Sequence, residues 1–349
     1  MTYPYGWSVV PRLIVKKERW PGGWQARSIP LVYPGQEVVP DQPVLRFEQS
    51  AQLAAVTSQK KQRGVSGQLG LSDSAPVASL SSTGQFQAPV SIGGSLSSRI
   101  EVPAGLHGRV VGFTGRNGVV IESRAALVQG VLGAGNQVAG VLTMWRAGGV
   151  SYVPYAIPPG ALLVVPGPLT FTLLRRALNS GVTGVIASSI ALRDLEGFLR
   201  TDYLQLLCAD DIDLAQAQLP PLTILLTEGI GSSIMPAHVV NLLHRYQGSI
   251  GLLSGVTSLK HNIYPELLIS LPVTETQENW QPVQPDTTLS LGAQVRINEG
   301  ERMGRIGYID YFFVYEQTFK SGIRARAVRL RMEDGSFDVV PLANIARIG

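Results

Sequence analysis

"ALLVVPGPLTFTLLRRALNSGVTGVIASS", residues 161–189, places two apolar runs on either side of a segment with a helical repeat. Residues 161–167 predict a buried strand, because a short apolar run bounded by Pro and Gly is typical of one. Residues 168–181 predict a helix that ends at Gly181, with one apolar face made of Leu169, Leu173, Leu174, Ala177 and Leu178. Residues 182–189 predict the next strand. A strand, a helix and a strand in this order indicate an α/β fold.

The same alternation continues toward the C-terminus. Residues 191–200 predict a helix and residues 223–229 a strand. Residues 236–248 predict another helix, with Pro236 in its first turn and Gly248 as its stop, and residues 249–255 predict a further strand. We therefore expect residues 156–273 to form a three-layer α/β domain with a mainly parallel sheet.

The N-terminal part, residues 1–155, reads as a β-rich domain. Residues 29–48 alternate short apolar runs with Pro-Gly and Pro-Asp turns, and Asn117-Gly118 predicts a hairpin with a type I′ turn. Residues 50–98 are rich in Ser, Gly, Gln and Ala, so they bury little apolar surface and are expected to form a mobile insertion.

"PGQEVVPDQPVLRFE" (34–48) and "AGLHGRVVGFTGRNGVVIES" (104–123) resemble, in their glycine and valine spacing, the two halves of a barrel-sandwich hybrid. That is the fold of biotinyl and lipoyl carrier domains. The resemblance implies a similar β-sandwich here. The modified lysine of the carriers has no counterpart, because Arg116 stands beside the Asn117-Gly118 tip. A swinging-arm function is therefore not predicted.

Residues 274–290 read as a proline-rich polar linker to an all-β module at 291–349. "GAQVRINEGERMGRIGYI" (292–309) is similar to the KOW motif, and "VRLRMEDGSFDVVPLANIARI" (328–348) adds a hairpin that turns at Asp334-Gly335. This resemblance implies a five-stranded SH3-like barrel, and its family occurs in ribosomal proteins and in NusG-type elongation factors. RNA binding is one function that it implies.

Charge and cysteine content exclude several classes of protein. The net charge is +4, of which residues 1–70 carry +5, residues 71–290 carry −3 and residues 291–349 carry +2, so no segment has the basic excess of a dedicated nucleic-acid binder. Cys208 is the only cysteine, which excludes an intrachain disulfide and favours the cytoplasm. We expect no signal peptide, and prolines interrupt the longest apolar stretch, residues 155–169, so no membrane span is expected.

Two groups of residues are candidate binding sites. Gly229, Gly231, Ser232 and Ser233 lie between a predicted strand and a predicted helix, where free backbone N–H groups can bind an anion. An ordinary strand-to-helix turn is the favoured interpretation of these residues. In the C-terminal module, Tyr311, Tyr315, Lys320, Arg324 and Arg326 combine aromatic rings with positive charge, as single-stranded RNA binding requires. Arg324 and Arg326 are expected on one strand face, and Arg329 and Arg331 share a face in the same way. A solvated strand face is the favoured interpretation of these arginines, and nucleic-acid binding is the alternative.

Neither a metal site nor a catalytic group emerges from the remaining polar residues. Asp210, Asp211 and Asp213 are clustered carboxylates, but they lack the further spaced ligands of a calcium loop and read as a solvated acidic loop. The four histidines form no metal-binding pair, and Ser232 has no nucleophile-elbow motif. We expect no cofactor and no metal. The favoured hypothesis is non-catalytic binding or scaffolding with a protein partner. The alternatives are RNA association through the C-terminal module, and an α/β enzyme or nucleotide binder that uses the 228–233 loop.

Overall fold

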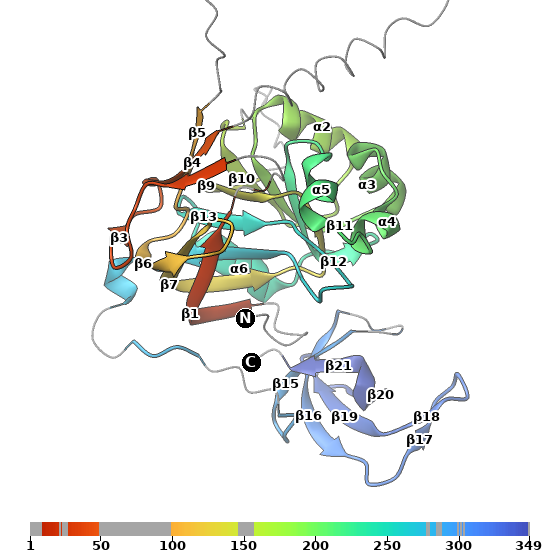
Figure 1. Ribbon diagram of the computed structural model, residues 1–349. Coiled ribbons are helices and arrows are strands. Elements are labelled where there is room, and N and C mark those ends of the chain that lie inside the picture. Colours follow the sequence, from red (N-terminus) through yellow and green to blue (C-terminus); the bar gives the residue numbers. More distant parts are fainter. Residues whose placement is uncertain are drawn as a thin grey trace, which may run out of the picture.

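The computed structural model describes residues 9–20, 22, 27–48, 99–145, 157–276, 280–283, 288–298, 300, 302 and 304–347. These residues form a mixed α/β fold that is made mostly of strands, as the sequence predicted at this level. One sheet has eleven strands, and three smaller sheets have five, three and two strands. Figure 1 shows the large sheet curled, with helices against it and the C-terminal strands gathered below it. The predicted insertion at residues 50–98 lies outside the described residues.

The predicted strand, helix and strand are present as β10 (Ala161–Val165), α2 (Phe171–Asn179) and β11 (Gly184–Ile190). Thr170 begins the helix, because its hydroxyl oxygen accepts a backbone N–H of the first turn at 3.3 Å. Gly181 follows the helix with a φ of 73°, a left-handed conformation that glycine adopts without strain. Capping residues at both ends therefore explain why the helix has these bounds.

The rest of the central segment alternates in the same way. The predicted helices and strands correspond to α3 (Leu192–Leu199), β12 (Thr223–Ile230), α6 (Ala237–Arg245) and β13 (Ile250–Ser254). Pro236 is the N-cap of α6 and does not lie in its first turn. Two short helices, α4 (Tyr203–Leu207) and α5 (Ile212–Ala217), and strand β14 (Glu266–Ser270) complete the segment. Within the described ranges, no helix is long and apolar enough to cross a membrane.

The large sheet is mixed, whereas the sequence predicted a mainly parallel one. Its parallel part is β9 (Gln137–Met144), β10, β11 and β12. The other ladders are antiparallel, and they involve β13, β14, β7 (Val119–Gln129) and β8 (Leu132–Ala134). Strands from both sides of residue 155 thus pair in one sheet. A fully buried strand has the same apolar pattern in both directions, so strand direction was not visible in the sequence.

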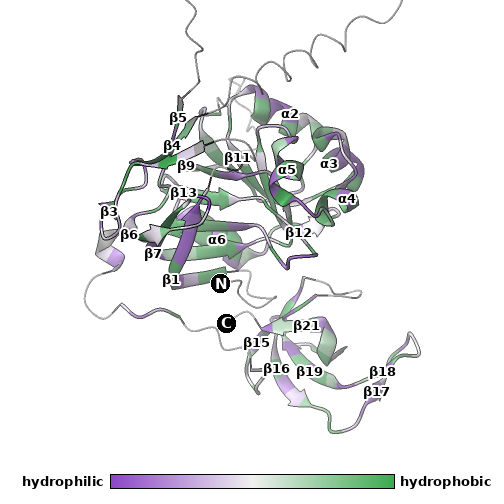
Figure 2. Ribbon diagram, in the orientation of Figure 1, coloured by the Kyte–Doolittle hydropathy of each residue, from purple (hydrophilic) through white to green (hydrophobic). Residues whose placement is uncertain are grey.

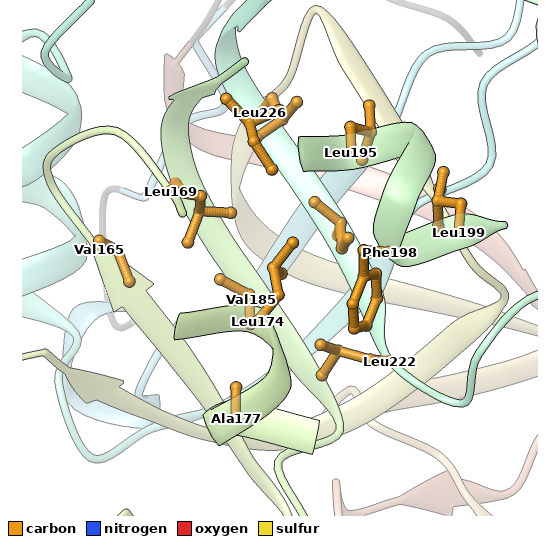
Figure 3. Close-up of a cluster of buried hydrophobic side chains, with 14 of the residues drawn as sticks. Val165, Leu169, Leu174, Ala177, Val185, Leu195, Phe198, Leu199, Leu222 and Leu226 are labelled. Atoms are coloured by element: carbon orange, nitrogen blue, oxygen red, sulfur yellow. The ribbon is translucent and has the colours of Figure 1, made fainter. Parts of the chain in front are cut away.

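Alternate residues of the parallel strands enter two different cores. In β10, Leu163 and Val165 pack with α2, α3 and α4, whereas Leu162 and Val164 pack with α6. Figure 3 shows the first of these cores, in which side chains of α2 and α3 meet the strands at Leu174, Ala177, Val185, Leu195, Phe198, Leu199, Leu222 and Leu226. Figure 2 shows the apolar colour concentrated on the strands, with both colours on α2 and α3. Helices therefore cover both faces of the parallel strands.

The large sheet closes on itself through β8. Only residues 130 and 131 separate β7 from β8, and β8 pairs with β12 at the other end of the strand order. The Val131 N–H donates to the Leu226 carbonyl at 2.8 Å and continues this contact. At the closure, a Cβ added to Gly255 would lie 2.2 Å from the Ala134 carbonyl oxygen. Only a glycine lets the two backbone segments approach this closely.

The N-terminal strands extend the large sheet and form a smaller sheet of their own. Strands β1 (Val9–Arg19), β3 (Glu37–Val38) and β6 (Gly108–Phe113) belong to the large sheet. The three-stranded sheet consists of β2 (Arg27–Pro30), β4 (Pro43–Glu48) and β5 (Arg99–Pro103). A third apolar core packs between them, and it includes Leu13, Leu45, Leu106 and Ile121.

The hairpin predicted at Asn117-Gly118 joins β6 to β7, but its turn is not type I′. The Asn117 N–H donates to the Thr114 carbonyl and the Gly118 N–H to the Thr114 hydroxyl. Of the two predicted turn residues, Asn117 has a positive φ of 60° and Gly118 does not. The tip is thus Gly115-Arg116, followed by a left-handed asparagine. A Cβ at Gly118 would lie 2.2 Å from a carboxylate oxygen of Glu18, so any larger residue there would displace the Glu18 side chain.

Glu18 of β1 anchors this hairpin. Its two carboxylate oxygens accept hydrogen bonds from Arg116 at 2.9 and 2.6 Å, and one of them also accepts the Thr114 hydroxyl at 2.5 Å. Burial alone raises the pKa of Glu18, but the hydrogen bonds from Arg116 and Thr114 outweigh burial and lower this pKa below its ordinary value. The Arg116 guanidinium also lies 4.8 Å from the centre of the Trp20 ring. The hairpin is therefore held by charge as well as by backbone pairing.

The C-terminal strands form a separate five-stranded sheet. In spatial order it contains β20 (Phe337–Pro341), β19 (Ala327–Met332), β16 (Ile306–Phe312), β15 (Gln294–Ile297) and β21 (Ile345–Arg347). The predicted hairpin at Asp334-Gly335 is present between β19 and β20, with Gly335 at a φ of 79°. A two-stranded ribbon, β17 (Gln317–Thr318) and β18 (Arg324–Ala325), projects from this sheet in Figure 1. A single-turn helix, η2 (Leu342–Asn344), precedes β21.

The segment predicted as a linker contacts β1 and the end of α6. Glu275, in the short helix η1 (Val273–Glu275), pairs with Arg245 at 3.1 Å and accepts the Tyr246 hydroxyl at 2.9 Å. The Val283 N–H donates to the Arg12 carbonyl of β1 at 2.7 Å. These contacts hold the chain against β1 and α6 before it reaches the C-terminal sheet.

Replacing Gly255 by Ala tests the closure of the large sheet. We expect Gly255→Ala to lower the free energy of unfolding by roughly 1–3 kcal/mol, because the new methyl group overlaps the Ala134 carbonyl and one backbone segment must move. Urea unfolding followed by circular dichroism measures the change. Gly112→Ala is the matched control, since nothing lies within 4 Å of a Cβ at that strand position. Equal losses in the two variants would contradict this role for Gly255.

Glu18→Gln tests the hairpin anchor through its pH dependence. Because the pKa of Glu18 is lower in the folded protein than the ordinary 4.5, its carboxylate stabilises the fold above that pH, and this stability is lost as the pH falls through the folded-state value. We therefore expect Glu18→Gln to be less stable than the wild type at about pH 7, with a smaller difference at about pH 3. Urea titrations at both pH values measure the two differences. A difference that is the same at both would exclude the carboxylate as its source.

Candidate functional site

The outward side of the C-terminal sheet carries two rows of large side chains. Strand register places Tyr308, Arg331 and Phe337 opposite one another, and it does the same for Tyr311, Arg329 and Val339. We call these six residues the outer face. Val328, Leu330 and Met332 alternate with the arginines of β19 and point into the core. The prediction that Arg329 and Arg331 share a strand face is confirmed.

The outer face exposes aromatic surface to solvent. The exposed fraction is 45% for Tyr311, 55% for Phe337 and 41% for Val339. Rings of this size dominate the energetics of cores and interfaces when they are buried. Their grouping on one sheet surface forms an apolar patch with no covering element among the described residues.

Arg329 is fixed in the middle of the outer face. It pairs with Asp310 of β16, with Nε and Nη2 lying 2.6 and 2.5 Å from the Asp310 carboxylate. Its guanidinium carbon lies 5.7 Å from the centre of the Tyr311 ring and 5.1 Å from that of Phe337. The strand register shifts between Ile309 and Tyr311, so Asp310 and Tyr311 both reach Arg329. Two rings and one arginine are thus held in place before any partner binds.

The other residues predicted for nucleic-acid binding lie away from the outer face. Tyr315 is 81% exposed and precedes the β17–β18 ribbon, and Lys320 lies in the turn of that ribbon. Arg324 is in β18, whereas Arg326 falls between β18 and β19, so the prediction of one shared strand face for these two arginines is wrong. A break between two strands has no clear sequence signal here, because "RARAV" alternates without interruption. The structure therefore brings Tyr311 together with Arg329 and Arg331, and it separates Tyr311 from the ribbon.

The loop predicted for anion binding continues the strand ladder. The Gly231 N–H donates to the Ile190 carbonyl at 2.9 Å, and the Ser189 hydroxyl donates to the Ser233 carbonyl at 2.9 Å. Gly229 lies within β12 with a φ of 78°, where the register with β11 shifts, and Ser232 is exposed. The Gly231 N–H is therefore already bound and is not free to bind an anion.

Glu228, next to this loop, forms a buried ion pair with Arg296 of β15. The Glu228 side chain is 3% exposed and the Arg296 side chain 11% exposed. The pair joins β12 of the large sheet to the C-terminal sheet. These two residues are far apart in the chain, and no sequence pattern predicts a contact over such a separation. The sequence analysis therefore missed this ion pair. A carboxylate at this position also opposes the binding of an anion by the adjacent loop.

Each aspartate of the acidic stretch has a different partner. Asp210 pairs with Lys260, Asp211 accepts the Leu214 N–H at 3.0 Å and caps α5, and Asp213 pairs with Arg116 at 3.1 Å. The described residues contain no group of three or more His, Cys, Asp or Glu side chains that could hold a metal ion. The stretch borders a cavity of about 700 Å³ beside β1 and the β6–β7 hairpin. The basic residues that line this cavity are all paired with carboxylates, and they are Lys16, Lys17 and Arg116.

Replacing Arg296 tests the ion pair between the two sheets. We expect Arg296→Leu to lower the free energy of unfolding by about 3–5 kcal/mol, because it leaves the Glu228 carboxylate buried without a counter-ion. The double variant Glu228→Gln with Arg296→Leu should recover part of this loss. The control is Lys16→Ala, which removes an exposed ion pair with Glu122 and should cost at most about 1 kcal/mol. A loss from Arg296→Leu as small as that of the control would show that Glu228 is not dependent on Arg296.

Comparison of the chain with models of known protein families, with curated proteins and with solved structures gave no match. Because these comparisons suggest no function, the proposed function is based on the geometry of the outer face and of the loops around it.

Proposed function

We propose that this chain is a non-catalytic binding protein and that its partner is another protein, which docks on the outer face of the C-terminal sheet. The observation that supports this most is the exposure of Tyr311 and Phe337 on either side of a fixed Arg329. Tyrosine, phenylalanine and arginine are enriched where proteins bind one another, and such residues carry most of the binding energy. Their fixed positions reduce the entropy that is lost when a partner binds.

The charge of the outer face favours a protein over RNA. Asp310 places a carboxylate beside Arg329, so the central arginine is neutralised and a phosphate would meet a negative charge. A protein partner can avoid this repulsion by placing apolar side chains over Tyr311, Phe337 and Val339. Arg331 has no ion pair among the described residues, so its guanidinium can pair with a carboxylate of the partner. The partner surface that fits best is therefore apolar with an acidic side chain near one edge.

We also propose a more detailed fold assignment. Residues 291–349 form a KOW-like SH3 barrel, which the five-stranded order and the apolar core of the C-terminal sheet support. Residues 1–155 contribute a barrel-sandwich-like part and residues 156–273 a three-layer α/β part, and the two parts share the large sheet. Residues 274–290 form the connection to the barrel. Two cores on opposite faces of the parallel strands support the three-layer assignment. We place the protein in the cytoplasm, as its single cysteine favours.

RNA binding is the second candidate function. It is supported by the exposed Tyr315 and by Lys320, Arg324 and Arg326, whose side chains form no ion pair within the described residues. These groups combine a ring for base stacking with charges for phosphate contact. A nucleotide-binding or enzymatic function at Gly229, Gly231, Ser232 and Ser233 has less support, because the Gly231 N–H is occupied and Glu228 lies beside the loop.

Crosslinking from the outer face tests the proposed function. A photo-reactive phenylalanine derivative at position 339 of the full-length chain should form a covalent product with one protein in cells, which mass spectrometry identifies. Binding of that purified protein to the full-length chain is then measured by isothermal titration calorimetry. We expect the double variant Tyr311→Ala with Phe337→Ala to weaken this binding at least about tenfold, because truncating central aromatic residues typically costs more than about 1 kcal/mol each.

Leu204→Ala is the control for the double variant, since Leu204 is equally apolar and 65% exposed but lies on α4. It should leave the affinity unchanged. The same proteins are titrated with a single-stranded oligouridine at about 150 mM salt. Unchanged partner binding in the double variant would exclude the outer face. Sub-micromolar RNA binding that is lost on Arg324→Glu with Arg326→Glu would make RNA the ligand.

A further inference from the structure

A second cavity lies between the short helices that cover one face of the large sheet. Its volume is about 650 Å³, and α2, α3, α4 and α5 all contribute to its lining. Figure 1 shows these four helices gathered on one side of the molecule, away from the C-terminal sheet. A volume of this size falls within the range of about 300–1,000 Å³ that is typical of small-molecule sites. The cavity is thus separate from the outer face, and nothing inferred from it depends on the proposed function.

The floor of this cavity is apolar. Phe198, Leu199 and Leu206 belong to the core beneath α3 and α4, and Leu178 and Leu219 pack partly buried against the same core. Figure 3 shows Phe198 and Leu199 at the edge of that core. A ligand that covers this floor must itself present an apolar body.

Two arginines stand at the rim of the cavity, and neither forms an ion pair or a hydrogen bond of its side chain within the described part of the chain. Arg175 comes from α2, where its guanidinium lies 6.0 Å from the Phe171 ring, and Arg200 follows α3. Asp211 is the single carboxylate in the lining, and it caps the N-terminus of α5. The rim therefore has two free positive charges above an apolar floor.

The backbone at Arg200 supports a role for its side chain. Arg200 is the C-cap of α3 in the left-handed conformation, with a φ of 59° and a ψ of 33°. Glycine usually occupies this position, because any other side chain strains the backbone there. A strained non-glycine residue is a reason to look for a function at that position. Here the strained residue is one of those that line the cavity.

From these observations we propose that the cavity binds a small amphiphile with an apolar tail and a single anionic head group. The tail covers the accessible parts of Leu178, Leu214 and Leu219 above this buried floor, and the head group pairs with Arg175 and Arg200. A carboxylate and a phosphate monoester share the required chemistry, since both present oxygen anions to guanidinium groups. The ligand class is therefore a medium-chain acyl carboxylate or an alkyl phosphate.

Calorimetric titration of the full-length chain with decanoate, decyl phosphate and decanol tests this site. At least one of the two anions should bind with a dissociation constant below about 1 mM, and decanol should bind about tenfold more weakly, because it lacks the charge. The comparison of decanoate with decyl phosphate identifies the head group. Failure of both anions to bind, or equal binding of decanol, would overturn the proposal.

Arg200→Gly separates function from stability at this position. Glycine relieves the left-handed backbone, so we expect the melting temperature to rise while binding of the preferred anion weakens about fivefold to tenfold. Arg175→Gln should weaken binding similarly, and Leu214→Trp should reduce it by filling the cavity. Arg193→Gln, on α3 but outside the lining, is the matched control and should bind as the wild type does. Unchanged binding in both Arg200→Gly and Arg175→Gln would refute the role of the rim.

Discussion

The closure of the large sheet by β8 is the contact on which the arrangement of the main body depends. Strand β7 pairs with β14, and two residues later the same stretch of chain, as β8, pairs with β12. A single segment thereby connects β7, near one end of the strand order, with β12, near the other. The contact is possible only because the backbone at Gly133 and Gly255 approaches its neighbours within distances that no Cβ would allow.

Closure determines what surrounds the parallel strands. Because the sheet curls, α6 packs on one face of β10, β11 and β12, whereas α2, α3 and α4 pack on the other. The helices on the second face are short, and they leave a cavity between them in place of a continuous layer. Toward the C-terminal end of β12, Glu228 meets Arg296 of the C-terminal sheet. A buried charge pair thus couples the position of that sheet to β12. Removing either partner alone leaves an unpaired buried charge and strongly destabilises the fold.

The C-terminal sheet and the helical face differ in the kind of surface that they present. The outer face exposes aromatic rings around an arginine that Asp310 neutralises, which suits a second folded surface. The helical face contains a cavity, and Arg175 and Arg200 form no ion pair with any described residue, which suits a small anion. Both surfaces consist of residues from several elements, and in both an arginine lies next to exposed apolar groups.

Local features were determined by the sequence alone. The helix α2 was predictable because its apolar repeat and Gly181 act within one or two turns, and the turn at Asp334-Gly335 was predictable for the same reason. The start of α2 at Thr170 was not predicted, since the sequence placed it at residue 168. The shared face of Arg329 and Arg331 followed from the two-residue repeat of a strand. Only the tertiary structure decided which strands pair and in which direction. It also decided that Asn117, and not Gly118, has the left-handed conformation, and that Glu228 pairs with Arg296. The physical reason is that an apolar run indicates that a segment is buried but not which segments it packs against. The neighbours of a strand are selected by hydrogen bonds and packing between residues far apart in the chain.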